Sequence, residues 1–194
     1  MWLDSYQPII LGSKSPRRKE LLKQIIPEFE VLASETDESY PENLLPNQIA
    51  EFVANKKARA YSQDQIIEKI LITADTIVTI NHEILGKPKG KQEAIDMLTK
   101  LSGKSHDVIT GVCLRLSSDI ETFHETTKVY FKPLSQKEIE YYIDNFKPYD
   151  KAGAYGIQEW IGLTAIEKIE GCYYNVVGLP VSALYRKLMS FNNK

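Results

Sequence analysis

The chain has 194 residues, of which 43% are hydrophobic and 26% charged, and its formal net charge is −2. This composition is typical of a globular protein that is soluble in water, and the near-zero charge gives no general attraction to nucleic acid or to a membrane surface. Any site for an anion must therefore be local. The two cysteines, Cys113 and Cys172, lack metal-ligand spacing, which argues against a zinc site or a disulfide framework and favours a reducing compartment.

The first ten residues have no basic start and no long apolar run, so we expect no signal peptide. No stretch approaches the roughly 18 apolar residues that cross a bilayer. Together with the cysteines, these features predict a cytoplasmic protein with neither a membrane nor a nucleic acid as partner. The length predicts a single domain over residues 1–194, or two small lobes that share a core.

The first predicted elements are a buried strand and a capped helix. Residues 8–11 (PIIL) form a short apolar run, and residues 12–14 (GSK) are typical of a tight turn. Ser15 is a good N-cap, and Pro16 fits the first helical position, where its missing N–H costs nothing. The helix N-terminus therefore points its unpaired N–H groups and its positive dipole end out of the turn.

Two adjacent arginines, Arg17 and Arg18, lie in this electropositive first turn. They repel each other unless an anion is bound there, and a phosphate chain would relieve the repulsion. The alternative is that the pair is only a solvated surface. From these residues alone, both interpretations stand.

The next segments are a short strand over 29–33, a polar stretch and a helix over about 46–62. Asn47 is the expected cap of this helix, and Ile49, Phe52 and Val53 are expected on its inner face.

Residues 70–80 (ILITADTIVTI) are β-branched and apolar around a single carboxylate, that of Asp75. A carboxylate in a buried strand must be paired, protonated or bound to a cation, because desolvating a lone charge costs several kcal/mol. Asp75 is thus a candidate metal ligand or general base. The structural alternative is an aspartate at a strand end that caps a turn.

The remaining segments predict alternating strands and helices. A turn at Asn81-His82 leads into residues 83–86, and a helix over 91–101 follows. Paired strands are expected over 106–117 and 122–131, with Ser118-Asp119 near the turn. A capping box at Ser135 opens a helix that ends near Phe146, and after it come a structured loop over 147–160, a strand over 164–170 and a last helix from about Pro180. The order predicts a mixed α/β fold, with a mixed sheet flanked by helices.

Glu35, Asp37 and Glu38 form an acidic cluster after the second strand. A solvated loop is the default, but if the cluster meets Asp75, two or three carboxylates could hold Mg²⁺ against phosphate oxygens. Lys57 ends a helical face. Lys87 lies in a glycine- and lysine-rich stretch that does not match a P-loop, because its glycines enclose three residues and Gln92 follows Lys91.

Gln158 lies in a glycine-rich, aromatic loop. Its carboxamide offers one donor and one acceptor, the pair that matches the imide edge of uracil or thymine. Alternatively, Gln158 ties down its own loop. The three histidines, His82, His106 and His124, lack the partners of a catalytic triad, so core or surface roles are expected for them.

Taken in order, these motifs resemble the Maf family of nucleoside triphosphate pyrophosphatases over nearly the whole chain. The matching stretches are SKSPRRKELL, ETDE, NKKARA, ADTIV, LGKPKGKQEAIDML, SGKSHDVITGV, ETTKVYF, DKAGAYGIQ and GCYYNVVGLP. The resemblance implies a mixed α/β fold of the inosine-triphosphate-pyrophosphatase type, with two lobes around a cleft and often a homodimer. It also implies hydrolysis of a nucleotide to its monophosphate and pyrophosphate with Mg²⁺ or Mn²⁺.

Carried onto this chain, the resemblance implies that Asp75 is the general base and also a metal ligand, with Glu35 as a further metal-site carboxylate. It implies phosphate contacts from Ser13, Arg17, Arg18, Lys57 and Lys87.

Arg17, Thr76 and Gln158 together resemble the subgroup that acts on dTTP and UTP. Glu159-Trp160 departs from the glycine-rich continuation that usually follows Gln158. The alternatives are a pyrophosphatase for modified or purine nucleotides such as 7-methyl-GTP, and a nucleotide-binding regulator of septum formation with little turnover.

Overall fold

The computed structural model describes residues 7–191. Its strands form one sheet in the order β2-β1-β3-β5-β6-β7, and β4 pairs with β3 outside this path. The strands are β1 (Ile9–Leu11), β2 (Glu30–Val31), β3 (Ile70–Ile80), β4 (Glu83–Leu85), β5 (Ser105–Leu116), β6 (Asp119–Phe131) and β7 (Ile166–Glu170). Parallel pairs (β1 with β2 and β3) and antiparallel pairs (β3 with β4, β6 with β7) coexist, so the sheet is mixed.

Helices separate most of the strands. The α-helices are α1 (Pro16–Ile25), α2 (Pro46–Arg59), α3 (Lys91–Leu101), α4 (Gln136–Phe146), α5 (Trp160–Ala165), α6 (Tyr173–Val177) and α7 (Val181–Phe191). Short 3-10 helices span Gln63–Ile66, Pro148–Asp150 and Ala152–Ala154. No helix within residues 7–191 is both long and apolar enough to cross a membrane.

The chain divides into two compact units. Unit 1 comprises the described residues up to Asp75, Thr110–Glu125 and the described residues from Gly178 onward, and unit 2 comprises Thr76–Ile109 and Thr126–Val177. One boundary between the units falls inside β3, between Asp75 and Thr76. The expectation of a single domain stays a prediction, as does the cleft.

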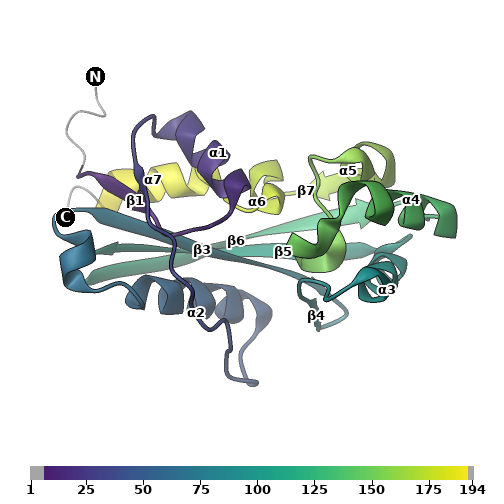
Figure 1. Ribbon diagram of the computed structural model, residues 1–194, viewed down its shortest axis with the longest axis horizontal. Coiled ribbons are helices and arrows are strands. Elements are labelled where there is room, and N and C mark those ends of the chain that lie inside the picture. Colours follow the sequence, from purple (N-terminus) through teal and green to yellow (C-terminus); the bar gives the residue numbers. More distant parts are fainter. Residues whose placement is uncertain (1–6, 192–194) are drawn as a thin grey trace. The chain divides into compact units, whose positions relative to one another are not determined.

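In unit 1, helices cover both faces of the sheet: α1 and α7 lie on one face and α2 lies on the other (Figure 1). α2 approaches β5 closely, because a Cβ on Gly111 would lie 2.2 Å from the carbonyl oxygen of Ala50. Ala54 and Ala58 are fully buried on the same helix. Small residues on both elements therefore set how near α2 lies to the sheet.

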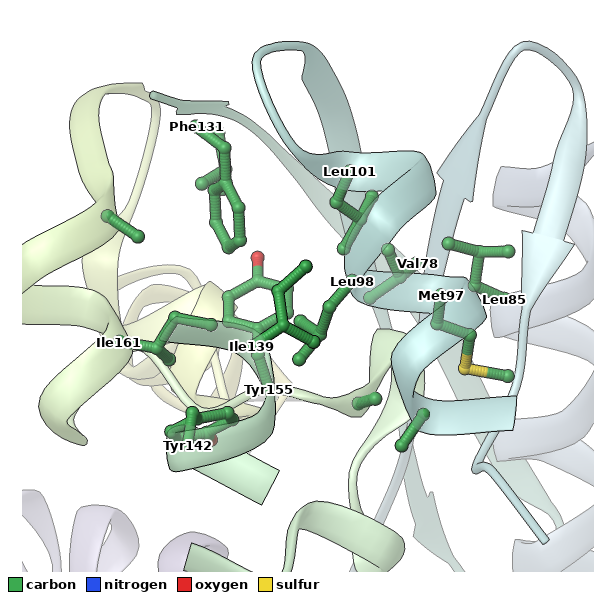
Figure 2. Packing of buried hydrophobic residues seen from close by; sticks show 14 of the residues in the cluster. Val78, Leu85, Met97, Leu98, Leu101, Phe131, Ile139, Tyr142, Tyr155 and Ile161 are labelled. Carbon is green, nitrogen blue, oxygen red and sulfur yellow. The ribbon is translucent and has the colours of Figure 1, made fainter. Parts of the chain in front are cut away.

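The core of unit 2 is a cluster of aliphatic and aromatic side chains from β3, α3, α4, β6 and the segment around Tyr155 (Figure 2). The rings of Phe131 and Tyr155 meet edge to face, with centroids 5.0 Å apart. Buried His106 accepts or donates a hydrogen bond of 2.8 Å between its Nε2 and the Tyr155 hydroxyl. Within residues 7–191, no hydrogen-bond partner is found for its Nδ1, and burial lowers the pKa of His106 to about 4.

The structure confirms the predicted mixed α/β fold and several element boundaries. The strand predicted over 70–80 and the helix predicted over 91–101 have the predicted ends. Ser15 caps α1 with Pro16 following it, and Ser135 forms the capping box of α4. Cys113 and Cys172 are both free thiols, as expected.

Other expectations are wrong in detail. Leu45, not Asn47, precedes the first turn of α2, and Gln48 accepts the Leu45 N–H at 2.9 Å. Phe52 is 39% exposed instead of lying on the inner face, because the alanine stripe of α2 takes the position against the sheet.

The strand predicted over 29–33 is confined to Glu30–Val31, and α2 ends at Arg59 instead of near residue 62. The remaining differences concern turns and short helices. The hairpin turn falls at Ser117-Ser118, one residue early, and the last strand begins at Ile166 because residues 160–165 form α5. No sequence pattern predicted α5 or α6.

Candidate functional site

The turn between β1 and α1 packs tightly against β3. The Gly12 N–H donates to the Ile72 carbonyl at 2.8 Å, and a Cβ at Gly12 would lie 2.8 Å from Cγ2 of Thr73. The Ser13 hydroxyl accepts the Ser15 N–H at 3.2 Å, which stabilises the turn before the helix begins. A glycine at this position is therefore what lets the N-terminal turn lie beside the strand that carries Asp75.

Arg18 joins the first turn of α1 to the backbone next to Asp75. Its Nη1 donates to the Ala74 carbonyl at 2.7 Å, and its Nε donates to the Gly178 carbonyl at 2.8 Å. Burial lowers the pKa of the Arg18 guanidinium, Asp75 opposes that shift, and the neighbouring Arg17 adds to it. The cationic helix end and the aspartate strand thus converge in unit 1.

Asp75 and Thr76 are the two half-buried residues of an otherwise buried β3. The Asp75 side chain is 14% exposed, and its Oδ1 lies 2.6 Å from Nζ of Lys57, itself 16% exposed. The same ammonium lies 2.8 Å from Oε1 of Glu38. Asp75 therefore lies within β3, not at a strand end, and one cation from α2 is shared by two carboxylates, which offsets their desolvation.

Each of the three carboxylates of the acidic cluster pairs with a different lysine. Glu35 is paired with Lys14 at 2.7 Å on the surface, and this hydrogen bond lowers the pKa of its carboxyl. Asp37 is bonded to Lys56 at 2.8 Å, and that bond with those of Ser39 lowers the pKa of Asp37. Only Glu38 shares a partner with Asp75. The structure thus brings Glu38, and not Glu35, to the cation that holds Asp75.

Arg115 supports the end of α2 that carries Lys57. Its guanidinium is buried, and its Nη1 donates to the carbonyls of Ala58 and Tyr61 at 2.8 Å each. These bonds connect β5 to the C-terminal end of α2 and to the segment that follows it. Sequence reasoning missed this residue, although a lone arginine in the apolar strand run VCLRL was a usable signal.

The other candidates lie in unit 2. Lys87 is exposed and follows β4, and Gln158 is exposed in a turn. The two segments are tied together, because the Gly153 N–H donates to the Gly86 carbonyl at 3.1 Å. Unit 2 therefore places the predicted phosphate-binding lysine and the predicted base-reading amide on linked loops.

The described residues contain no group of three or more His, Cys, Asp or Glu side chains placed to hold a metal ion. They do provide two carboxylates, Glu38 and Asp75, that converge on one cationic atom. Mg²⁺ in phosphate-processing sites is commonly held by one or two carboxylates together with substrate phosphates and water. Glu38 and Asp75 are two carboxylates of this kind, and in this structure the Lys57 ammonium lies between them.

Two of the solved structures that the chain resembles are distant from it in sequence. The Staphylococcus aureus Ham1 protein matches at 14% identity with a TM-score of 0.48, over 64% of this chain and 72% of that chain. A nucleoside-triphosphatase (dITP/XTP pyrophosphatase) from Mycobacterium abscessus matches at 9% identity with a TM-score of 0.40, over the same shares. Likenesses this weak carry no argument about fold or function.

Comparison with curated proteins finds much stronger relationships. Proteins named dTTP/UTP pyrophosphatase from Bacteroides fragilis and Bacteroides thetaiotaomicron are 50% and 48% identical over 187 residues, 96% of each chain. One of the same name from Porphyromonas gingivalis is 47% identical over 186 residues, 94% of each chain. The model of the Maf-like protein family matches residues 8–191. The chain is therefore a member of the Maf-like protein family.

Proposed function

We propose that this protein hydrolyses dTTP and UTP to the nucleoside monophosphate and pyrophosphate. The observation that carries the proposal is the half-buried Asp75, held 2.6 Å from Lys57 beside the carbonyl that Arg18 binds. Desolvating an ionised carboxylate lowers the stability of the folded protein. A carboxylate kept in such a position next to cations is therefore a candidate for a role in phosphate chemistry. The names of the relatives, at up to 50% identity, support the same substrates.

In the proposed reaction, Asp75 takes a proton from a water molecule whose oxygen attacks the α-phosphorus. The bond from that phosphorus to the bridging oxygen breaks, and pyrophosphate leaves with the bonding electrons. Arg17 and Lys87 are proposed to stabilise the charge on the leaving group, while Ser13 contacts the phosphates from its turn. General-base catalysis supplies about 10²–10⁴-fold, so positioning and cationic stabilisation supply the rest.

Arg18 and Lys57 have structural bonds as well as proposed phosphate contacts. Arg18 donates hydrogen bonds to two backbone carbonyls, those of Gly178 and Ala74. Lys57 bridges Glu38 and Asp75. Both cations thus keep Asp75 in place and add positive charge where a triphosphate is proposed to bind.

We propose that Asp75 and Glu38 hold the Mg²⁺ or Mn²⁺ that the reaction uses. A divalent ion polarises a phosphoryl oxygen and makes a bound water easier to deprotonate. The metal role expected for Glu35 stays a prediction, and its pairing with Lys14 favours Glu38 over it.

We propose that Gln158 hydrogen-bonds the imide edge of the base, with Thr76 as a further substrate contact next to Asp75. The two free thiols support a reducing, cytoplasmic location. A homodimer and a link to septum formation stay predictions from the resemblance.

A substrate panel tests the proposed function. Purified protein with Mg²⁺ is given dTTP, UTP, 7-methyl-GTP and unmodified purine triphosphates, and pyrophosphate and monophosphate are measured. We expect the highest kcat/KM for dTTP and UTP, with pyrophosphate and monophosphate in equal amounts. Preference for 7-methyl-GTP, release of inorganic phosphate, or binding of nucleotide without consumption would each contradict the proposal.

A further inference from the structure

Glu159 follows Gln158 in the chain, and its side chain is turned inward. Its Oε2 accepts a hydrogen bond from the Tyr142 hydroxyl, and its Oε1 lies 3.1 Å from Nζ of Lys151. The Glu159 side chain is 19% exposed and that of Lys151 is 9% exposed. This carboxylate is thus part of a largely buried network on the turn that carries Gln158.

Hydrogen bonds of this network hold both ends of the turn, Gly156 and Glu159. The Tyr142 hydroxyl also accepts the Gly156 N–H at 3.0 Å, and the Glu159 N–H donates to the Gly156 carbonyl at 3.0 Å. Burial, and next the Glu159 carboxylate, raise the pKa of Tyr142, so its hydroxyl keeps its proton and remains a donor. Residues 156–159 are therefore held from α4 as well as by their own backbone.

The same network surrounds the carboxamide of Gln158. A Cβ at Gly156 would lie 3.2 Å from Nε2 of Gln158, 3.1 Å from Cδ of Glu159 and 3.1 Å from Cε of Lys151. All three side chains thus border the small space that glycine leaves. Nε2 of Gln158 thus borders the same small space as the Glu159–Lys151 ion pair, although Gln158 itself is exposed.

This placement matters because a carboxamide has two different ends of nearly the same shape. Uracil and thymine present a carbonyl oxygen and an N–H, whereas cytosine presents an amino group and a ring nitrogen acceptor. A carboxamide that rotates freely between its two orientations can hydrogen-bond either of these base edges equally well. Glu159 and Asp150 share the one ammonium of Lys151, at 3.1 and 2.8 Å, so this group has a net negative charge and favours the orientation in which the NH₂ end of the amide faces it.

We propose that Glu159 is a positioning residue that sets base selectivity by fixing the orientation of the Gln158 carboxamide. Tyr142 and Lys151 hold the Glu159 carboxylate in place for this purpose. The inference rests on the proposed function, in which Gln158 contacts the base. It gives the unusual residue after Gln158 a role in discriminating uracil and thymine from cytosine.

The first experiment compares kcat/KM for UTP and CTP in the wild-type protein and in Glu159→Gln. This change keeps the size of the side chain and removes its charge. We expect the ratio of UTP to CTP to fall about tenfold, the factor that one ordinary hydrogen bond gives, through KM, with kcat for UTP unchanged. Glu167→Gln, an exposed carboxylate in β7 of the same unit, is the matched control and should leave the ratio unchanged.

A double-mutant cycle separates positioning through Gln158 from a general loss of structure. In the Gln158→Ala background, Glu159→Gln should have no further effect on the ratio, because the amide it orients is gone. A variant that weakens the fold would instead lower both activities together and reduce Tm.

The outcomes distinguish the two levels of the proposal. If the wild-type protein does not favour UTP over CTP, or Gln158→Ala keeps the preference, the proposed role of Gln158 fails and this inference fails with it. If Gln158→Ala erases the preference but Glu159→Gln retains it, only the role of Glu159 is refuted. A further fall in the ratio on adding Glu159→Gln to Gln158→Ala would also refute it.

Discussion

The two units hold their candidate residues by different means. Unit 1 collects ionised groups around one strand: Asp75, Lys57 and Glu38 form a shared ion pair next to Arg18. Unit 2 presents one neutral amide, that of Gln158, on a turn fastened by Tyr142 and Glu159. In the proposed reaction, the charges of unit 1 would serve bond cleavage and the fixed turn of unit 2 would serve recognition of the base.

This difference predicts how substitutions divide between rate and selectivity. A change among the charges of unit 1 should lower turnover for every nucleotide alike. A change on the turn of unit 2 should alter which base is accepted while cleavage continues.

Among the substitutions that compare the two units, the largest effect is expected from Lys57→Met. Removing the shared cation leaves Glu38 and Asp75 without the ammonium that bridges them, so the carboxylates move apart and positive charge near the phosphates is lost. We expect kcat to fall about 10²–10³-fold, the usual cost of removing one group that stabilises developing charge, with the UTP to CTP ratio intact.

Lys56→Met is the matched control, because Lys56 is the preceding residue of α2 and pairs with Asp37 instead. It should leave kcat nearly unchanged. Equal losses in the two variants, or a changed base ratio in Lys57→Met, would contradict the division of labour between the units.

A pH effect on stability is expected from the core of unit 2. His106 has a pKa lowered to about 4 from 6.5 by burial. Between pH 6.5 and about 4, His106 is therefore protonated in the unfolded chain but neutral in the folded chain. The free energy of unfolding consequently falls as the pH falls toward 4. At about 1.4 kcal/mol per pH unit, this one group costs about 3 kcal/mol across the window.

Urea unfolding of the wild-type protein and of His106→Gln, each at pH 7 and pH 5, measures this contribution. The variant should lose less stability on acidification than the wild type, by about 2 kcal/mol. Identical pH dependence in His106→Gln and the wild type would show that His106 does not stay neutral in the core.

A smaller effect distinguishes the two candidate metal carboxylates of unit 1. Glu38→Gln should raise the Mg²⁺ concentration needed for half-maximal activity about tenfold, within the range seen when a metal site loses a supporting carboxylate. Glu35→Gln should leave it unchanged, because Glu35 is bonded to Lys14 on the surface. The reverse result would restore Glu35 as the metal carboxylate.

Local sequence patterns predicted the elements whose formation depends on local chemistry. Ser15 and Pro16 mark the start of α1, and the apolar run over 70–80 marks β3 with Asp75 inside it. The exposed position of Phe52 was not predictable, because it depends on the approach of Ala50 to Gly111, far away in the sequence.

The site was predictable in its residue types but not in its pairings. The sequence pointed to Asp75, Lys57 and an acidic cluster, yet which carboxylate reaches Lys57 depends on how the loop before α2 folds back. The inward orientation of the Glu159 side chain was likewise not predictable from the sequence, because it depends on Tyr142 of α4. Long-range contacts, and not local propensity, decide both.

The most direct test of the account is Asp75→Asn, measured as single-turnover release of pyrophosphate from dTTP with Mg²⁺ present. The change keeps the shape of the side chain and removes the proposed base. We predict a rate lower by about 10²–10⁴-fold, with Tm close to that of the wild type and with dTTP still bound. If a folded Asp75→Asn protein released pyrophosphate at the wild-type rate, the result would contradict the role of Asp75 as the base and the proposed reaction.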